Sequence, residues 1–177
     1  MRKGIATQNN IYKVYDNETN QALDGTVTVQ LPPFELASNS FSGAGVAGEI
    51  DVPVPGKMNP QTVSLSVPVI YGAMTKYMQL GTTRTLDLRN EVIVNNADTH
   101  ALEKVPNRWV LKGVLSKADP GKVEQGVPAD GSLEMKLVYA HHWLDGDDVL
   151  EWDPYKFIYT VDGEDLLAET RQNILVG

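Results

Sequence analysis

Apolar and polar residues alternate along much of this chain. In Thr62–Val67 (TVSLSV) the apolar residues alternate with hydroxyl residues, and in Thr82–Val94 leucines fall on one face while charged residues fall on the other. A period of two residues is typical of a strand that has one face in the core and one in water. Similar patterns predict further strands, which are Ile11–Val14, Gly25–Leu31, Glu49–Val54, Trp109–Ser116, Leu133–Leu144, Val149–Trp152 and Lys156–Val161.

Helical spacing occurs in fewer places. In Val69–Gly81 (VIYGAMTKYMQLG) apolar residues recur three or four positions apart, and the closing glycine stands where a C-terminal cap belongs. This segment is the strongest helix prediction. A short helix is expected within Asn95–Val105, with Asp98 as its candidate cap. A last helix is expected from Glu164 to about Asn173, with Asp162 as its cap.

The order of these elements predicts the fold class. Strands, one helix, more strands and a terminal helix follow one another, with a strong hairpin signal at Asp145-Gly146 and without the alternation of a nucleotide-binding sheet. We predict one mainly-β domain over residues 1–177. It is an antiparallel β-sandwich or barrel-forming sheet with one main helix and a short C-terminal helix. Residues 1–23 are expected to form a flexible N-terminal arm, and the Gly-rich residues 37–48 a long loop.

Composition narrows the choice of partners. The chain has no cysteine, so disulfides, thiolate metal sites and a cysteine nucleophile are excluded. Its formal charge is −8 and it has no basic run, which argues against tight DNA binding but not against DNA passing nearby. No signal peptide is visible after Met1, and no run of about 20 apolar residues is present that could span a membrane.

Few residues in the chain suggest catalysis or metal binding. The adjacent His141 and His142 would point to opposite faces of a strand, His141 beside Tyr139 and Trp143, and His142 beside Glu134 and Lys136. A shared metal is therefore not expected. The sequence contains no phosphate-binding glycine motif and no nucleophile elbow. We expect neither an enzyme nor a cofactor, although a catalytic pair of carboxylates stays open.

Residues 145–165 are rich in acids. They hold Asp145, Asp147, Asp148, Glu151, Asp153, Asp162, Glu164 and Asp165, with Lys156 as the opposing charge. A calcium loop would need its glycine after the first ligands, whereas Gly146 comes early in a short hairpin. We therefore expect a solvated acidic edge, part of which could face a protein partner.

The C-terminal third resembles a known family in the order of its segments. A strand ends in the Asp-Pro-Gly turn of Lys117–Gly121, an aromatic strand runs over Tyr139–Gly146, Glu151–Pro154 reads EWDP, and Val161–Leu175 closes the series. This order is similar to the major tail tube protein of contractile phage tails and phage-tail-like bacteriocins. The strand and Leu-Pro start of Val27–Leu36 and the Gly-rich Ser42–Pro55 extend the resemblance. Residues 1–23 match poorly, and Asp162 and Leu166 are further apart than in the family.

The resemblance implies a structural role. Subunits of this family form hexameric rings that stack into a hollow tube, in which strands of neighbouring subunits join into one barrel. The implied partners are further copies of the chain, the tail sheath protein, and the baseplate and tail-terminator proteins. DNA would pass without specific binding, and a target membrane would be met only on puncture. The implied location is the virion tail or a secreted tail-like particle, assembled in the host bacterial cytoplasm.

The resemblance also suggests two sets of functional residues. Acids on the polar faces of strands are the candidates for lining the lumen, namely Glu49, Asp51, Asp87 and Glu91. Residues 37–48 are expected to order against the next ring, with contacts at Phe41, Gly43, Gly45 and Gly48. One alternative is the tube of a contractile injection or secretion system, which differs in cargo. Another, of a different class, is a monomeric β-sandwich binding domain or enzyme that uses the acidic edge.

Overall fold

The computed structural model describes residues 4–45 and 47–174, and almost all of its regular structure is strand. The strands of the first half are β1 (Gly4–Asp16), β2 (Gln21–Ala22), β3 (Thr28–Gln30), β4 (Leu36–Phe41), β5 (Ile50–Met58) and β6 (Thr62–Val67). The helices are η1 (Gly72–Met78), a 3₁₀-helix, and α1 (Ala168–Asn173). The remaining strands are β7 (Thr83–Asn96), β8 (Leu102–Asp119), β9 (Gly131–Leu144), β10 (Asp147–Asp153), β11 (Ile158–Val161) and β12 (Glu164–Asp165).

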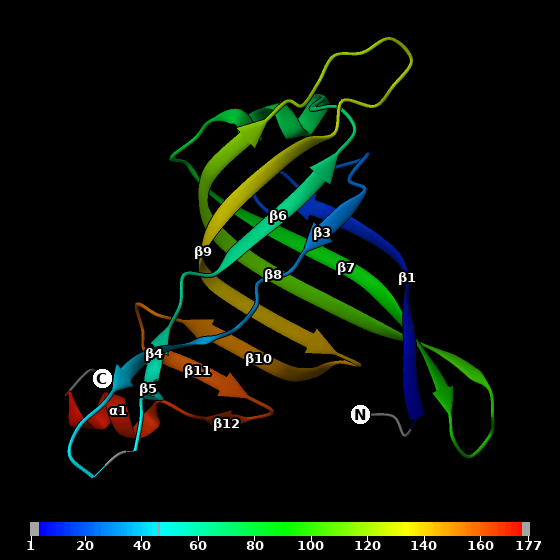
Figure 1. Cartoon of the computed structure of the whole chain (residues 1–177). Coiled ribbons are helices and arrows are strands. Elements are labelled where there is room, and N and C mark those ends of the chain that lie inside the picture. The colour runs from blue at the N-terminus through cyan, green and yellow to red at the C-terminus, as the bar shows by residue number, and fades with distance from the viewer. Residues whose placement is uncertain (1–3, 46, 175–177) are drawn as a thin grey trace.

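One antiparallel sheet carries most of the chain (Figure 1). Its strand order is β12-β11-β10-β9-β8-β7-β1-β2. Strand β9 has a second set of neighbours, because its first half pairs with β6, which in turn pairs with β3. Its second half pairs with β10 instead. The sheet therefore branches along β9, and β3 and β6 fold over β7 and β8 as a second layer. The prediction of a mainly-β, antiparallel fold is confirmed.

The branch point coincides with a β-bulge at Val138. Tyr139 pairs with Lys112 and Leu137 pairs with Gly113, so Val138 is an extra residue in β9. A bulge of this kind reverses the alternation of faces beyond it. Before the bulge the odd-numbered residues of β9 are buried, and after it Ala140 is the buried one. Strand β9 can thus pair with β6 along its first half and with the differently oriented β10 along its second half.

The core lies between the two layers. Buried residues of β6 and of the first half of β9, which pair side by side, share one cluster with those of β7 and β8, while Met74 and Tyr77 of η1 close one end. Phe34, in the segment after β3, stacks on Trp109 and meets the edge of Trp152, which extends the core towards β10. Burying one such large side chain contributes about 1.5–3 kcal/mol, so this interface holds the layers together.

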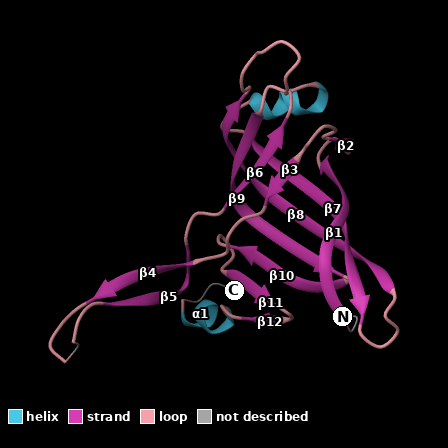
Figure 2. Ribbon diagram, turned by 45° about the vertical axis from the view of Figure 1, so that its right-hand side comes forward, coloured by secondary structure: helices cyan, strands magenta, loops and turns pink. Residues whose placement is uncertain are grey.

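Strands β4 and β5 form a separate two-stranded sheet (Figure 2). In that view the hairpin extends away from the main sheet on the side of α1. The long loop predicted for residues 37–48 is therefore wrong over Ala37–Phe41, which continue β4 and pair with β5. The small polar residues there show no alternation of apolar and polar positions, because neither face of this hairpin strand is buried in a core.

Three local predictions are also corrected. Residues 4–16 form β1, paired with β7 over most of its length, so the described part of the expected N-terminal arm is largely strand, while residues 1–3 lie outside the described residues. The segment around Asp98 is a hairpin turn without a helix, in which the Asn96 side chain accepts hydrogen bonds from two backbone amides. Asp162 occupies the tight turn between β11 and β12 at φ 50°, so it does not cap α1.

Candidate functional site

The outer face of the main sheet is polar, and the strand register arranges it in rows. One row runs from Lys13 on β1 through Arg89 and Arg108 to Trp143 on β9, each directly opposite the next. The adjacent row contains Tyr15, Asp87, Val110, His141 and Glu151. Because the opposite face of these strands packs into the core, this face is the one available to solvent or to a lumen.

Asp87 lies at the centre of this face, and two arginines cover it. Arg108 donates from Nε to Oδ1 at 3.0 Å and from Nη2 to Oδ2 at 2.8 Å, while Arg89 donates from Nε and Nη2 to Oδ2. The Asp87 side chain is only 2% exposed. Burial alone would raise the pKa of Asp87, but the hydrogen bonds from Arg108 and Arg89 outweigh it and hold the pKa below its usual value.

The candidate lumen residues fall into two separate groups. Asp87 and Glu91 share the outer face of β7, where Glu91 accepts a hydrogen bond from Asn10 and forms an ion pair with Lys104. The Asn10 hydrogen bond and Lys104 lower the pKa of Glu91. Glu49 and Asp51 belong to the β4–β5 hairpin instead, where Asp51 accepts a hydrogen bond from Ser40. The structure does not bring the four acids together within one subunit.

His141 belongs to a compact polar network on the outer face. Its ring stacks on Trp143, one ring nitrogen lies 2.9 Å from the Tyr139 hydroxyl, and the other lies 2.9 Å from the Asp148 carboxylate. Burial and the nearby Glu151 raise the pKa of Tyr139 to about 12. The predicted neighbours of His141 are therefore confirmed.

His142 lies elsewhere than predicted. It stacks on Trp109 and hydrogen-bonds Asn107 on the core side, and it does not lie beside Glu134 and Lys136. The bulge at Val138 accounts for the difference, because it moves the residues beyond it to the other face. Burial, reinforced by His141, lowers the pKa of His142 to about 4.

Most of the acids in residues 145–165 have local partners. Asp148 pairs with His141, and Asp153 accepts backbone hydrogen bonds from the turn that follows it. Asp165 binds the guanidinium of Arg171, a cation from α1 that the sequence interpretation did not include. Within the described residues no cluster of histidines and acids could hold a metal ion. The acids of this segment therefore serve mainly in ion pairs and turns among its strands.

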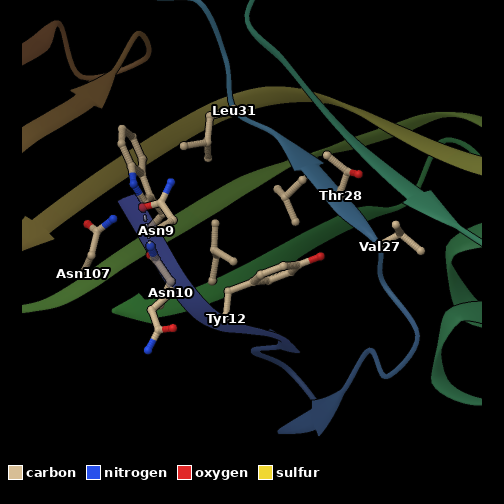
Figure 3. Close-up of a pocket in the computed structure, with 11 residues that line it drawn as sticks. Asn9, Asn10, Tyr12, Val27, Thr28, Leu31 and Asn107 are labelled. Atoms are coloured by element: carbon tan, nitrogen blue, oxygen red, sulfur yellow. Dashed lines mark hydrogen bonds between the residues drawn. The ribbon is translucent and has the colours of Figure 1, made fainter. Parts of the chain in front are cut away.

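A cleft separates the edges of β1 and β3 (Figure 3). It measures about 330 Å³, and Tyr12 reaches from β1 across its floor and donates a hydrogen bond to the Thr26 carbonyl. Asn9 and Asn10 lie on the β1 side, and Val27 and Thr28 on the other. The two edges are therefore close but unpaired, so the sandwich is open along this seam.

The β4–β5 hairpin exposes apolar side chains. Phe41 is 54% exposed and pairs with Ile50, which is 47% exposed. Gly43, Gly45 and Gly48 follow in the connecting loop, and the last two adopt positive φ angles. Isolated two-stranded hairpins are marginally stable in water, and apolar residues at such a tip favour contact with another surface.

The fold and these surfaces define an open, mainly antiparallel β-protein with free sheet edges and exposed apolar side chains among the described residues. The family model of phage tail tube protein FII matches residues 10–174, and the chain therefore belongs to this family. A comparison with curated proteins finds no match. Within the described residues, no helix is long and apolar enough to cross a membrane. A structural role in the tail tube follows from the family.

Proposed function

We propose that this chain is the subunit of the inner tube of a contractile tail. Hexameric rings of the chain stack into a hollow conduit, through which DNA is delivered or with which an envelope is punctured. The sheath protein surrounds the tube, and the baseplate and tail-terminator proteins contact its ends. Assembly takes place in the host bacterial cytoplasm, and the chain has no catalytic function.

The family match over residues 10–174 carries this proposal. Three features of the subunit support it. One end of the sheet is β12. At the other end the short β2 pairs only with Tyr15 and Asp16 of β1, so the rest of the outer edge of β1 is unpaired among the described residues. Closing a sheet with a neighbour removes such edges. The outer face carries charged and aromatic side chains suited to a water-filled lumen, and the β4–β5 hairpin extends away from the main sheet with Phe41 exposed for contact with another subunit.

Negative-stain electron microscopy of the purified chain tests the proposal. We expect hexameric rings with a central hole, and filaments of stacked rings as the concentration rises. Mass photometry across the same concentrations should show monomers and hexamers with few intermediates. A strict monomer at every concentration would refute the proposal and favour a binding domain. Tubes isolated from particles that lack DNA would instead identify a bacteriocin or an injection system.

A further inference from the structure

Three cations lie side by side on the outer face of the sheet. Lys13 of β1 is paired with Arg89 of β7, and Arg89 is paired with Arg108 of β8. Like charges directly opposite one another on neighbouring strands are destabilising. Their presence in a chain with a net charge of −8 therefore needs a compensating interaction.

Asp87 provides part of that compensation and fixes the two guanidiniums, and the exposed Asp24 forms an ion pair with Lys13 at 3.6 Å. Both arginines bind Asp87 through Nε and Nη2, and no hydrogen bond among the described residues uses Nη1 of either. Their side chains remain 58% and 43% exposed. Arg89 lies over the Tyr15 ring and Arg108 over the Trp143 ring, which further restricts both guanidiniums. Pre-positioned donors thus face outwards.

Around the row, on β1, β7 and β8, cations outnumber acids. The described residues of this face on those strands carry the cations Lys13, Arg89, Lys104, Arg108, Lys112 and Lys117 and the acids Asp87, Glu91 and Asp119, whereas β9 and β10 add the acids Glu134, Asp148 and Glu151 beyond them. Next to the row, a cavity of about 260 Å³ is lined by Pro106, Arg108, Trp143 and Gly146. A small anionic group could therefore approach Arg108 without any rearrangement of the backbone.

We propose that Lys13, Arg89 and Arg108 form a weak, sequence-independent binding site for the phosphodiester groups of passing DNA. This inference rests on the proposed function, in which the outer face lines the lumen. Exposed guanidinium donors suit phosphate oxygens, and contacts to phosphates carry no sequence information. The site lies on the face of the sheet, whereas a neighbouring subunit would join at its edges. The row gives passing DNA brief contacts with the wall of the tube, where the acids alone would only repel it.

Fluorescence anisotropy with a labelled 16-base-pair duplex tests the site on the full chain at low salt. We expect weak binding, equal for two unrelated sequences, that weakens linearly as the logarithm of salt concentration rises. Lys13→Gln and Arg89→Gln should each lower the affinity about fivefold and reduce the salt slope by about one. Lys13 does not contact Asp87, whereas Arg89 does, so the Lys13→Gln variant reports on binding even if Arg89→Gln impairs folding. Asp87→Asn should strengthen binding, because it leaves both arginines uncompensated.

The matched controls are Lys57→Gln on β5 and Lys156→Gln after β10, both exposed lysines outside the row. They should leave affinity nearly unchanged. Equal losses in the controls, or no binding by the unmodified chain, would overturn the site. Electron microscopy of the same samples separates the two proposals. If rings form but do not bind DNA, only the proposed phosphate site is wrong. If the chain binds DNA but forms no rings, only the proposed tube function is wrong. Loss of rings in Lys13→Gln with unchanged DNA binding would assign the row to a neighbouring subunit and overturn the inference.

Discussion

Asp87 and His142 show how much a single residue depends on strands far away in the sequence. Alternation in β7 placed Asp87 on the polar face, but its charge is compensated by Arg108, which reaches it only through the pairing of β7 with β8. The surroundings of the His142 ring are likewise determined by Trp109 and Asn107 of the neighbouring strand. The pKa of His142, which is about 4, has a measurable consequence for stability.

His142 should make the free energy of unfolding depend on pH. Its folded pKa of about 4 lies below its ordinary value, so the folded state binds fewer protons than the unfolded state between those two values. The free energy of unfolding should therefore fall as pH falls from about 6.5 to about 4, by at most about 1.4 kcal/mol per pH unit. Urea unfolding at several pH values measures this slope.

The matched variants for this measurement are His142→Gln and His100→Gln. The first removes the half-buried imidazole and should flatten the dependence above pH 4, while the second alters an exposed turn residue and should leave it unchanged. An identical slope in the His142→Gln variant would assign the dependence to other groups, of which His141, Asp148 and Glu151 are the nearest on β9 and β10.

At the scale of elements, the branch along β9 requires a residue without a side chain in β8. Gly113 lies opposite Leu137 beside the bulge, and a Cβ atom on it would overlap the backbone carbonyl of Lys136. Backbone atoms on a bulged, fully paired strand cannot move aside easily. The close approach of β8 and β9 therefore depends on this glycine.

Gly113→Ala should lower the free energy of unfolding by about 1–3 kcal/mol, the usual cost of overpacking. Chemical denaturation followed by tryptophan fluorescence measures the change. Gly126→Ala is a comparison at a glycine whose added Cβ meets no atom, although its positive φ adds local strain. If the Gly113→Ala variant were as stable as the parent chain, the bulge would not need this close approach of β8 and β9.

Strands with regular alternation could be predicted, and irregular ones could not. Thr62–Val67 was predicted to the residue because β6 has one face in the core. The predicted position of His142 beside Glu134 and Lys136 was wrong, because the bulge at Val138 exchanges the two faces of β9 and a bulge has no signature in a single sequence. The η1 segment kept its helical spacing over Gly72–Met78 but folded as a 3₁₀-helix. Pairing partners such as Arg108 and Asp87 depend on register, which local patterns do not contain.

The β4–β5 hairpin is the element on which we expect ring stacking to depend. Phe41→Ser combined with Ile50→Ser should leave the stability of the subunit unchanged, because both side chains are exposed and lie outside the main core. Tubes should fail to elongate while single rings persist, as seen by electron microscopy. Leu102→Ser is the control, because Leu102 at the start of β8 is an even more exposed apolar residue outside the hairpin.

Hydrogen exchange gives a second measure of the same prediction. Residues 37–48 should be protected in tubes and exchange readily in free subunits. Equal protection of these residues in both states would contradict a role in stacking. Normal tubes formed by the double variant would contradict it independently, because apolar contacts would then be dispensable.

At the scale of the whole molecule, the subunit is an open structure. The cleft between β1 and β3 leaves one seam of the sandwich unclosed, and β1 lies near the opposite end of the main sheet from β12. Ile5 and Ile11 on β1 are 70% and 73% exposed, although they lie on a strand paired with β7 along one side. Such exposed apolar residues do not add to the stability of an isolated subunit, whereas contact with a neighbouring subunit in a ring would bury them.

Ile11→Lys should therefore weaken ring formation without unfolding the subunit. The change replaces an exposed apolar side chain with a charged one, so the free energy of unfolding of the monomer should stay within about 0.5 kcal/mol of the parent value. The concentration at which half the chains are in rings should rise at least about tenfold, since about 1.4 kcal/mol of lost contact per subunit suffices. Mass photometry across a dilution series measures this concentration. Gln125→Lys adds the same charge in the exposed β8–β9 loop, where no ring contact is expected, and should leave it unchanged. If Ile11→Lys assembles like the parent chain while the rings themselves are present, β1 is not the edge through which subunits join.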